Sequence, residues 1–560
     1  MDLKAIVADA LTHVLSDWNK NDLYELIETP KHSHLGDQAF PCFQLARSWK
    51  KAPHVIAGEI ADALSSPFFS KVEAVGPYVN IRFDGVKAGK KIVSAILAKG
   101  NDYGSHEFGN RKTIVLDMSS PNIAKPFSMG HLRSTVIGNS IATIAEKCGY
   151  TTEKINYIGD WGTQFGKLIV AFNKWGDQQK VKDNPIAELF ILYKKFHEEA
   201  EKDASLEEEG RKAFKLLEDG DPEVTELWRW FKDESLHAFK TIYTLLGVEF
   251  DSYNGEAYFN DKMDEVVTLL EDHDLLETSE GAKVVRLEGT LPPCLIKKSD
   301  GATLYATRDL AAALYRHRQH HFDEALYVVG QEQTIHFKQV MEVLKKLGFN
   351  WADDMKHIPF GLYLKDGKKM STRKGRVILL EEVLKEAIYM AEENIKQKNP
   401  NLINASEVAK DVGVGAIIFH DLKNDRVNDI EFSLEYMLTF EGETGPYIQY
   451  TYARAQSILR KAGAPLPLTF EGLDDAESWE VIKQLRLFPE IVEKAWKQYA
   501  PSTIAKYLVD TAQSFNRYYG KTKIISEDSQ QVSRLALVHA VSTVLAEGLR
   551  LLGMKSPSEM

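Results

Sequence analysis

Short apolar runs alternate with longer stretches of helical periodicity through the middle of the chain. The apolar runs at 113–118, 154–158, 324–329 and 357–364 have the length and composition of buried strands. A helical pattern follows the first run, from Leu132 to about Cys148, and the next residue is a glycine that suits a C-terminal cap. We therefore expect an α/β domain in this part of the chain.

The flanking parts have different patterns. Residues 1–109 mix helix and strand, and G-D-Q-A-F at 36–40 and V-G-P-Y-V-N-I-R-F at 75–83 indicate turns and strands. Beyond about Leu380 the pattern is almost entirely helical, with a glycine- and proline-rich loop at 463–467. A charged helical stretch at 184–246 is typical of a solvated helical insertion.

These patterns predict three domains. We expect an α+β domain at 1–110, an α/β domain at 111–380 with a helical insertion at about 170–285, and an all-α domain at 381–560.

Composition and charge narrow the class of protein. Of the 560 residues, 44% are hydrophobic and 27% are charged, as in ordinary globular proteins. We find no apolar run long enough to span a bilayer and no secretory signal, so we expect a cytoplasmic protein. The net charge of −12 argues against a protein that coats nucleic acid nonspecifically, although it permits a local basic groove.

The cysteines argue against a structural metal. Cys42, Cys148 and Cys294 are far apart, and none has a partner at zinc or disulfide spacing. We therefore expect a reducing compartment and no structural zinc.

The segment N-I-A-K-P-F-S-M-G-H, at 122–131, joins the first predicted strand to the helix that follows it. A helix entrance presents unpaired N–H groups and the positive end of the helix dipole, which suit phosphate. Gly130 permits close approach of a ligand, His131 can donate to a phosphate oxygen, and Lys125 can neutralise one. The segment predicts a nucleotide site, with a structural histidine as the alternative.

Five further segments occur in a fixed order with the first. They are Y-I-G-D-W-G-T-Q-F-G at 157–166, L-Y-A-T-R-D-L-A-A-A-L-Y at 304–315, V-V-G-Q-E-Q-T-I-H-F at 328–337, K-M-S-T-R-K-G at 369–375 and F-E-G-E-T-G-P-Y-I-Q-Y-T-Y-A-R-A at 440–455. Together they resemble the arginyl-tRNA synthetases, a family of class I aminoacyl-tRNA synthetases, over nearly the whole chain. S-M-G-H at 128–131 occupies the family's HIGH position, and K-M-S-T-R at 369–373 occupies its KMSKS position.

The resemblance implies a fold and a reaction. The α/β segment would be a Rossmann-like catalytic domain, the C-terminal helices an anticodon-binding bundle, and the first hundred or so residues an add-on domain that meets the tRNA elbow. The enzyme would join arginine to ATP, release pyrophosphate, and transfer arginine from the adenylate to the 2′-hydroxyl of the terminal adenosine. ATP would carry Mg²⁺, which mostly keeps its own waters, and the family is commonly monomeric.

The resemblance assigns catalysis to residues at the two signature motifs. The catalytic residues would be Lys125, Ser128, His131 and Lys369. The ATP-binding residues would be Lys125, Ser128, Gly130, His131, Lys369, Met370 and Ser371.

Two positions depart from the usual motifs. Ser128 replaces the first histidine of HIGH, and Thr372 replaces the second lysine of KMSKS, so a cation near the phosphates is missing. Our hypothesis is that Lys125 supplies that charge, with Arg373 and Lys374 as alternatives. The other alternative is that Lys125 is a surface lysine whose stem packs on a neighbouring aromatic ring.

The amino-acid pocket must recognise a planar guanidinium, which carboxylates bind best through paired hydrogen bonds. Tyr305 and Asp309 are four residues apart and would share a helical face. The resemblance places the arginine site at Ser120, Pro121, Asn122, His131, Glu256, Tyr305, Asp309 and Gln333. Without the resemblance, Asp309 would be a charge near a helix N-terminus.

Aromatic and basic residues interleave in the C-terminal helices, as suits the stacking of single-stranded bases. Tyr447 and Arg454 are seven residues apart and would lie on one helical face, and the tail at Met560 would lie near the anticodon. We expect all three to contact tRNA. The alternative is that the tyrosines line the core of the bundle.

Two other kinds of function compete with this interpretation: another class I synthetase, such as the cysteinyl or glutaminyl enzyme, and a tRNA-binding protein without catalysis. A cysteinyl enzyme would need zinc ligands that three scattered cysteines do not supply, and a glutaminyl enzyme would have a β-barrel in place of the C-terminal helices. A tRNA-binding protein that has lost catalysis would explain Ser128 and Thr372 but not the presence of His131, Lys369 and Asp309.

Overall fold

The computed structural model describes residues 1–299, 305–369, 379–463 and 469–560. They divide into two compact units, each of which gathers segments that are distant in sequence. The first unit comprises Met1–Tyr103, Thr451–Pro489 and Asp510–Glu547, and the second comprises Gly104–Tyr450, Glu490–Val509 and Gly548–Met560.

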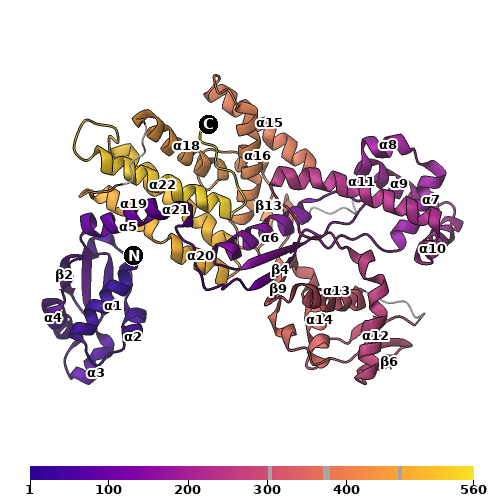
Figure 1. The fold of residues 1–560 in the computed structure, drawn as a ribbon, viewed down its shortest axis with the longest axis horizontal. Coiled ribbons are helices and arrows are strands. Elements are labelled where there is room, and N and C mark those ends of the chain that lie inside the picture. Colours follow the sequence, from indigo (N-terminus) through magenta and orange to yellow (C-terminus); the bar gives the residue numbers. More distant parts are fainter. Residues whose placement is uncertain (300–304, 370–378, 464–468) are drawn as a thin grey trace. The chain divides into compact units, whose positions relative to one another are not determined.

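Figure 1 labels most of the helices and strands along the chain. The helices are α1 Leu3–Val14, α2 Lys20–Leu26, α3 Ala46–Trp49, α4 Pro53–Ala63, α5 Gly85–Lys99, α6 Met129–Lys147, α7 Thr163–Trp175, α8 Gln178–Asp183, α9 Pro185–Ala200, α10 Ser205–Glu218, α11 Pro222–Leu246, α12 Met263–Asp272, α13 Tyr305–His320, α14 Thr334–Lys346, α15 Leu380–Lys398, α16 Ala405–Leu422, α17 Leu434–Met437, α18 Gly445–Ala462, α19 Ala476–Arg486, α20 Phe488–Lys497, α21 Pro501–Lys521 and α22 Gln531–Leu551. The strands are β1 Gln38–Pro41, β2 Phe69–Val75, β3 Tyr78–Phe83, β4 Thr113–Asp117, β5 Thr151–Ile155, β6 Leu276–Ser279, β7 Ala282–Val285, β8 Cys294–Lys297, β9 Glu324–Gly330, β10 Met355–Phe360, β11 Tyr363–Lys365, β12 Lys368–Lys369 and β13 Ile430–Glu431.

The first unit is built around a small antiparallel sheet. Its strand order is β1-β3-β2, and β1 pairs with β3 in the register Gln38↔Ile81. The turns and strands expected at 36–40 and 75–83 are therefore present. After β3, Asp84 caps α5 by accepting hydrogen bonds from the N–H groups of Val86 and Lys87, and the helix then packs on α19 of the same unit.

The second unit contains the parallel sheet predicted from the apolar runs. Its order is β10-β9-β4-β5, and every neighbouring pair is parallel. Because parallel strands end at one edge, the segments that follow β4 and β9 emerge side by side. That edge is the expected place for a ligand in an open α/β sheet.

The last predicted strand divides into two. The run at 357–364 is interrupted at Gly361, whose N–H donates to the carbonyl of Arg426. The chain then leaves the parallel sheet and enters a second sheet of order β12-β11-β13. Lys369 ends β12, where it pairs with Leu364 of β11.

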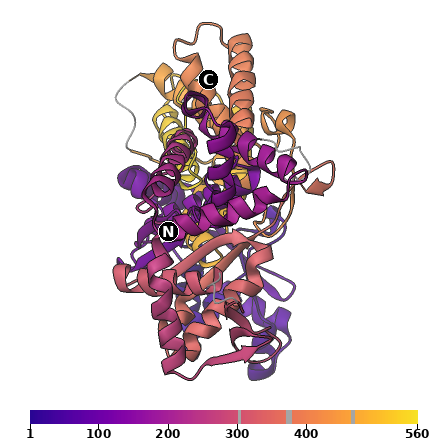
Figure 2. The ribbon, with the colours of Figure 1, turned by 90° about the vertical axis from the view of Figure 1, so that its right-hand side faces the viewer.

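The helical insertion is present, and it gathers α8, α9, α10 and α11 into one cluster (Figures 1 and 2). Local sequence sets the bounds of its longest helix: Asp221 caps α11, Pro222 is its first residue, and Gly247 ends it at φ 67°. A separate group, α12 with α13 and α14, packs over a common apolar core together with β8 and β9.

Among the described residues beyond Leu380, the chain is helical except for the short strand β13 and the connections between elements. One described helix, α22, is long and apolar enough to cross a membrane, which the sequence analysis did not anticipate. However, 78% of its most apolar window is buried inside the protein, as in a core helix.

Candidate functional site

A cavity of about 1100 Å³ opens where β4 and β9 end. Its walls come from the loop after β4 and the start of α6, from the end of β9 and the turn that follows it, from the β10–β11 connection, and from one face of α9. The cavity therefore lies at the sheet edge where the fold predicts a ligand.

The entrance of α6 presents a neutral histidine to this cavity. Ser128 caps the helix, and its N–H donates to His131 Nδ1 at 3.1 Å, with its hydroxyl 3.2 Å from the same atom. Burial, and secondarily the nearby charge of Lys125, lowers the pKa of His131 to about 4. Since Nδ1 accepts, the proton of the neutral ring belongs on Nε2, where it is available to a ligand oxygen.

The loop before α6 is held in a rarely populated backbone conformation. Ser119 and Ser120 have φ values of 73° and 51°. The N–H of Ser119 donates to Ser134 Oγ at 2.8 Å, and Ser120 Oγ donates to Asp117 Oδ1 at 3.0 Å. Such conformations persist only where the surroundings enforce them, and they cluster at functional sites.

Asn122 is fixed by the second signature segment. Its loop pairs with Gly159, whose N–H donates to the carbonyl of Pro121 at 3.0 Å while its own carbonyl accepts from Ile123 at 3.1 Å. A Cβ at Gly159 would lie 2.1 Å from Asn122 Oδ1. The glycine of Y-I-G-D is therefore required for Asn122 to keep its place in the cavity wall.

The residues that come after the second signature motif, Leu379 and Leu380, pair with the first motif. Leu379 forms a bridge with Ser128, and the N–H of Leu380 donates to the carbonyl of Phe127 at 3.1 Å. Met370, Ser371, Thr372, Arg373 and Lys374 lie outside the described residues, and so does the side chain of Lys369.

Two carboxylates that do not line the cavity form an acidic group: Asp309 belongs to α13, and Glu256 begins a short 3-10 turn before α12. Asp309 Oδ2 is 2.5 Å from His336 Nε2, and Glu256 Oε2 is 3.9 Å from Arg308 Nη1. Burial raises the pKa of Glu256 to about 7, against the attraction of Arg308 and with added repulsion from Asp309. A guanidinium bound between the two carboxylates would offset their mutual repulsion.

Tyr157 and Asp117 connect the acidic group to the cavity. The buried hydroxyl of Tyr157 has no hydrogen-bond partner among the described residues, and burial, with Asp309 and Glu256 as further causes, raises its pKa. Asp117 pairs with Arg316 at 2.7 Å, and it also accepts from Ser120, which lines the cavity. Sequence reasoning missed both residues, although each lies at the edge of a segment that it singled out.

The predicted residues thus fall into three groups. Those that line the cavity are Ser120, Asn122, Lys125, Ser128, Gly130, His131 and Gln333. Asp309 and Glu256 form the acidic group. The remaining two lie outside these two groups: the carbonyl of Pro121 accepts from Gly159, and Tyr305, 63% exposed, begins α13 one turn before Asp309.

A face of α9 completes the cavity, which sequence reasoning did not foresee. Phe190, Tyr193 and His197 line it at helical spacing, and Lys125 Nζ lies 5.9 Å from the centre of the Tyr193 ring. The spacing was visible in the sequence, but the expectation of a solvated helix was wrong for this face. Only the packing of the insertion shows which face meets the sheet.

None of the three predicted tRNA contacts is among the residues that line the cavity. Tyr447 and Arg454 both belong to α18, as their spacing required. Arg454 bonds to Asn516 and lies 5.2 Å from the centre of the Tyr519 ring. Near the C-terminus, the carbonyl of Met560 accepts from Asn399 at 3.4 Å.

Comparison with known families covers almost the whole chain. Residues 92–434 match the catalytic domain of class I tRNA synthetases for arginine, residues 448–560 match the DALR anticodon-binding domain, and residues 1–83 match the arginyl-tRNA synthetase N-terminal domain.

Individual relatives agree with the family matches. The chain is 60% identical to arginine–tRNA ligase 1 of Bacillus cereus and 56% identical to arginine–tRNA ligase of Enterococcus faecalis, in each case over 100% of both chains. Among solved structures, Thermus thermophilus arginyl-tRNA synthetase has a TM-score of 0.80 at 25% identity and is covered in full, as is this chain. The Plasmodium falciparum enzyme, at 22% identity and a TM-score of 0.80, shares the fold, with 100% of this chain and 98% of that chain covered.

Proposed function

The chain belongs to the arginyl-tRNA synthetase family and is an ATP-dependent arginine–tRNA ligase, and on that premise we propose how its side chains divide the reaction. The enzyme activates arginine as an adenylate and then charges tRNA. A carboxylate oxygen of arginine attacks the α-phosphorus, the bond to pyrophosphate breaks, and the 2′-hydroxyl of the terminal adenosine later displaces AMP.

ATP would bind at the entrance of α6. Ser128, Gly130 and His131 line the cavity there, and the first turn of the helix offers backbone N–H groups to the phosphates. His131 would donate through Nε2 as a neutral group, because its pKa of about 4 keeps it unprotonated at neutral pH. Lys369, Met370 and Ser371 would complete the phosphate site from the second motif.

Lys125 would supply the positive charge that is missing from the second motif, where Thr372 stands in place of a lysine. It lines the same cavity as Ser128 and His131, and its charge contributes to the lowered pKa of His131. A fixed cation that faces the developing charge on the phosphate oxygens stabilises the transition state more than the ground state.

Arginine would bind with its guanidinium toward the acidic group and its carboxylate toward the phosphates. Asp309 and Glu256 would pair with the guanidinium, while Asn122 and Gln333 would hold the amino and carboxylate ends. Ser120, Pro121, His131 and Tyr305 would complete the pocket. An analogue without the guanidinium would lose the charge-assisted hydrogen bonds to both carboxylates, so the site would reject it strongly.

Mg²⁺ would enter with ATP. The described residues contain no group of three or more His, Cys, Asp or Glu that could hold a metal. In our proposal, phosphates and water provide most of the ligands of the ion. When bound with ATP, Mg²⁺ would supply positive charge beside the phosphates.

The tRNA would contact three parts of the chain, which we propose as domains with the bounds expected from the sequence. Residues 1–110 would meet the elbow, residues 111–380 the acceptor end, and residues 381–560 the anticodon, with Tyr447, Arg454 and Met560 among the contacts. We also propose a cytoplasmic monomer.

The observation that best supports these assignments is the shared cavity of Lys125, Ser128, His131 and Gln333. The test is ATP–pyrophosphate exchange with each amino acid, with and without tRNA. Of the amino acids, only arginine should support exchange. Lys125→Ala should lower the exchange rate about a hundredfold. Lys195→Ala, on the same helix as Tyr193 but outside the cavity lining, should leave the exchange rate unchanged. Near-normal exchange by Lys125→Ala would end its assignment.

A further inference from the structure

Asp37, in the segment G-D-Q-A-F, is a buried carboxylate that no step of the ligase reaction uses. It is 7% exposed, and both of its oxygens accept hydrogen bonds. Oδ2 accepts from the N–H of Phe83 at 2.9 Å, and Oδ1 accepts from Trp479 Nε1 and Lys483 Nζ, each at 3.1 Å. One carboxylate therefore joins the N-terminal sheet to α19. Asp37 and Trp479 lie more than 440 positions apart in the sequence.

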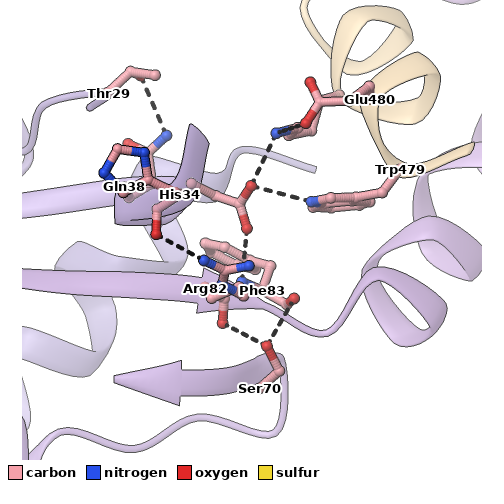
Figure 3. Close-up of polar contacts among 10 residues, drawn as sticks. Thr29, His34, Gln38, Ser70, Arg82, Phe83, Trp479 and Glu480 are labelled. Carbon is pink, nitrogen blue, oxygen red and sulfur yellow. Dashed lines mark hydrogen bonds and ion pairs between the residues drawn. The ribbon is translucent and has the colours of Figure 1, made fainter. Parts of the chain in front are cut away.

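Figure 3 shows Trp479 and Glu480 on α19 facing the strand that carries Arg82 and Phe83. Lys483 is shared, because it also pairs with Glu480 at 2.8 Å. The side chain of Lys483 is 23% exposed and that of Asp37 only 6%, so the carboxylate is the buried centre of the contact. Charge-assisted hydrogen bonds are directional, and three of them from two segments fix the angle at which the segments meet.

The apolar packing around Asp37 brings the same segments together. Trp479 packs against the core of the N-terminal segment, and a Cβ added at Gly85 of α5 would lie 3.5 Å from its ring. Residues 1–103 and 451–489 accordingly fall in one compact unit.

We propose that Asp37 is a positioning residue for tRNA, which holds the elbow-binding and anticodon-binding segments as one rigid body. The inference rests on the tRNA contacts proposed above for these segments. When two contact sites are joined rigidly at the correct spacing, the second contact forms with little further loss of entropy. Loosening the joint therefore weakens binding only for an RNA that reaches both sites.

The experiment compares two RNAs. One is the full arginine-accepting tRNA, and the other lacks its D and T loops, with the acceptor and anticodon stems joined by a flexible linker. Asp37→Asn removes the charge with almost no change in shape. It should raise the KM for full tRNA about tenfold, the effect of one charge-assisted hydrogen bond, while the KM for the elbow-less RNA and the KM values for ATP and arginine stay unchanged.

Two further variants separate this role from general stability. Trp479→Phe removes the indole donor and keeps an aromatic ring, although a smaller one, and it should raise the KM for full tRNA about threefold. Glu471→Gln breaks the Lys90–Glu471 pair, which joins the same segments at 2.5 Å but is exposed, and it should change nothing measurable.

The outcomes are distinct. If the wild-type enzyme uses both RNAs equally well, the proposed elbow contact is wrong. If the wild-type enzyme prefers full tRNA but Asp37→Asn keeps its KM, or raises the KM equally for both RNAs, the positioning role is overturned. Should Asp37→Asn fail to fold, Trp479→Phe and Lys483→Met carry the same comparison.

Discussion

Two titratable groups among the predicted site residues, His131 and Glu256, have pKa values that their surroundings shift from the usual range. Burial lowers the pKa of His131 to about 4, so it acts as a neutral donor. Burial raises the pKa of Glu256 to about 7, so its charge depends on what lies beside it. In each case the position in the fold, rather than the residue type, sets the protonation state.

Arginine binding should strengthen as the pH rises. A guanidinium pairs with the ionised form of Glu256, so a proton on that carboxylate competes with the substrate. Below the pKa of about 7, the KM for arginine should rise by up to about tenfold per pH unit, and above it the KM should level off. Steady-state kinetics from about pH 6 to about pH 8.5 measure this, with Glu256→Gln expected to give a higher but flat KM. A flat profile in the wild-type enzyme would contradict the assignment.

Gly130 should be required by the ligand rather than by the fold. A Cβ there would meet only Ser128 Oγ at 3.6 Å, an ordinary contact, and the residue is exposed within a helix. Gly130→Ala should therefore leave the free energy of unfolding unchanged or raise it by up to about 1 kcal/mol. The KM for ATP should rise at least about tenfold, because the methyl group projects into the cavity. Urea unfolding and exchange kinetics test the two halves separately, and a destabilised variant would contradict the argument.

At the scale of elements, the charges of α9 predicted a solvated surface helix, but in the structure one face of α9 forms a wall of the cavity. Its aromatic face lines the same cavity as the entrance of α6, where we propose that the reaction takes place. Aromatic rings bind unpaired bases by stacking.

Tyr193→Ala should weaken the use of tRNA. Loss of one stacked base is worth about 1–3 kcal/mol, so the KM for tRNA should rise roughly fivefold or more. Tyr193→Phe keeps the ring and should behave as wild type, while Ile191→Ala, exposed on the same helix and outside the cavity lining, serves as the control. Equal activity of Tyr193→Ala and Tyr193→Phe would exclude stacking.

A buried ion pair joins two further elements. Arg133 of α6 and Asp421 of α16 are 3.3 Å apart and almost wholly buried, and Arg133 also donates to the carbonyls of Asn428 and Arg426. Burial raises the pKa of Asp421 despite the arginine beside it.

Arg133→Met should destabilise the protein by roughly 3–5 kcal/mol, because it leaves a buried carboxylate without a counter-charge. The loss of unfolding free energy should be smaller at low pH. The pKa of Asp421 is already raised, so its carboxylate takes up a proton there and no longer needs a counter-charge. Urea unfolding at two pH values tests this, and the double variant Arg133→Met, Asp421→Leu should recover most of the loss. A loss independent of pH would show that packing, not charge, dominates.

At the scale of the whole molecule, the net charge of −12 requires that basic residues be gathered locally for tRNA. Much of the fold followed from local pattern: the parallel strands, α6 with its cap, and the helices of the insertion all lie close to their predicted places. The interrupted strand at Gly361 was missed because its break is caused by a bond to Arg426, a residue distant in sequence.

The sequence by itself determined the family and the fold class, and it identified residues later found in the cavity wall, because those residues lie in short segments of fixed order. It also determined local features such as helix ends, since caps depend on neighbours in the chain. Only the tertiary structure decided which face of α9 lines the cavity, how Gly159 holds Asn122, which states His131 and Glu256 adopt, and that Asp37 joins two distant segments. These properties depend on burial and on contacts between residues far apart in the chain, which no local pattern encodes.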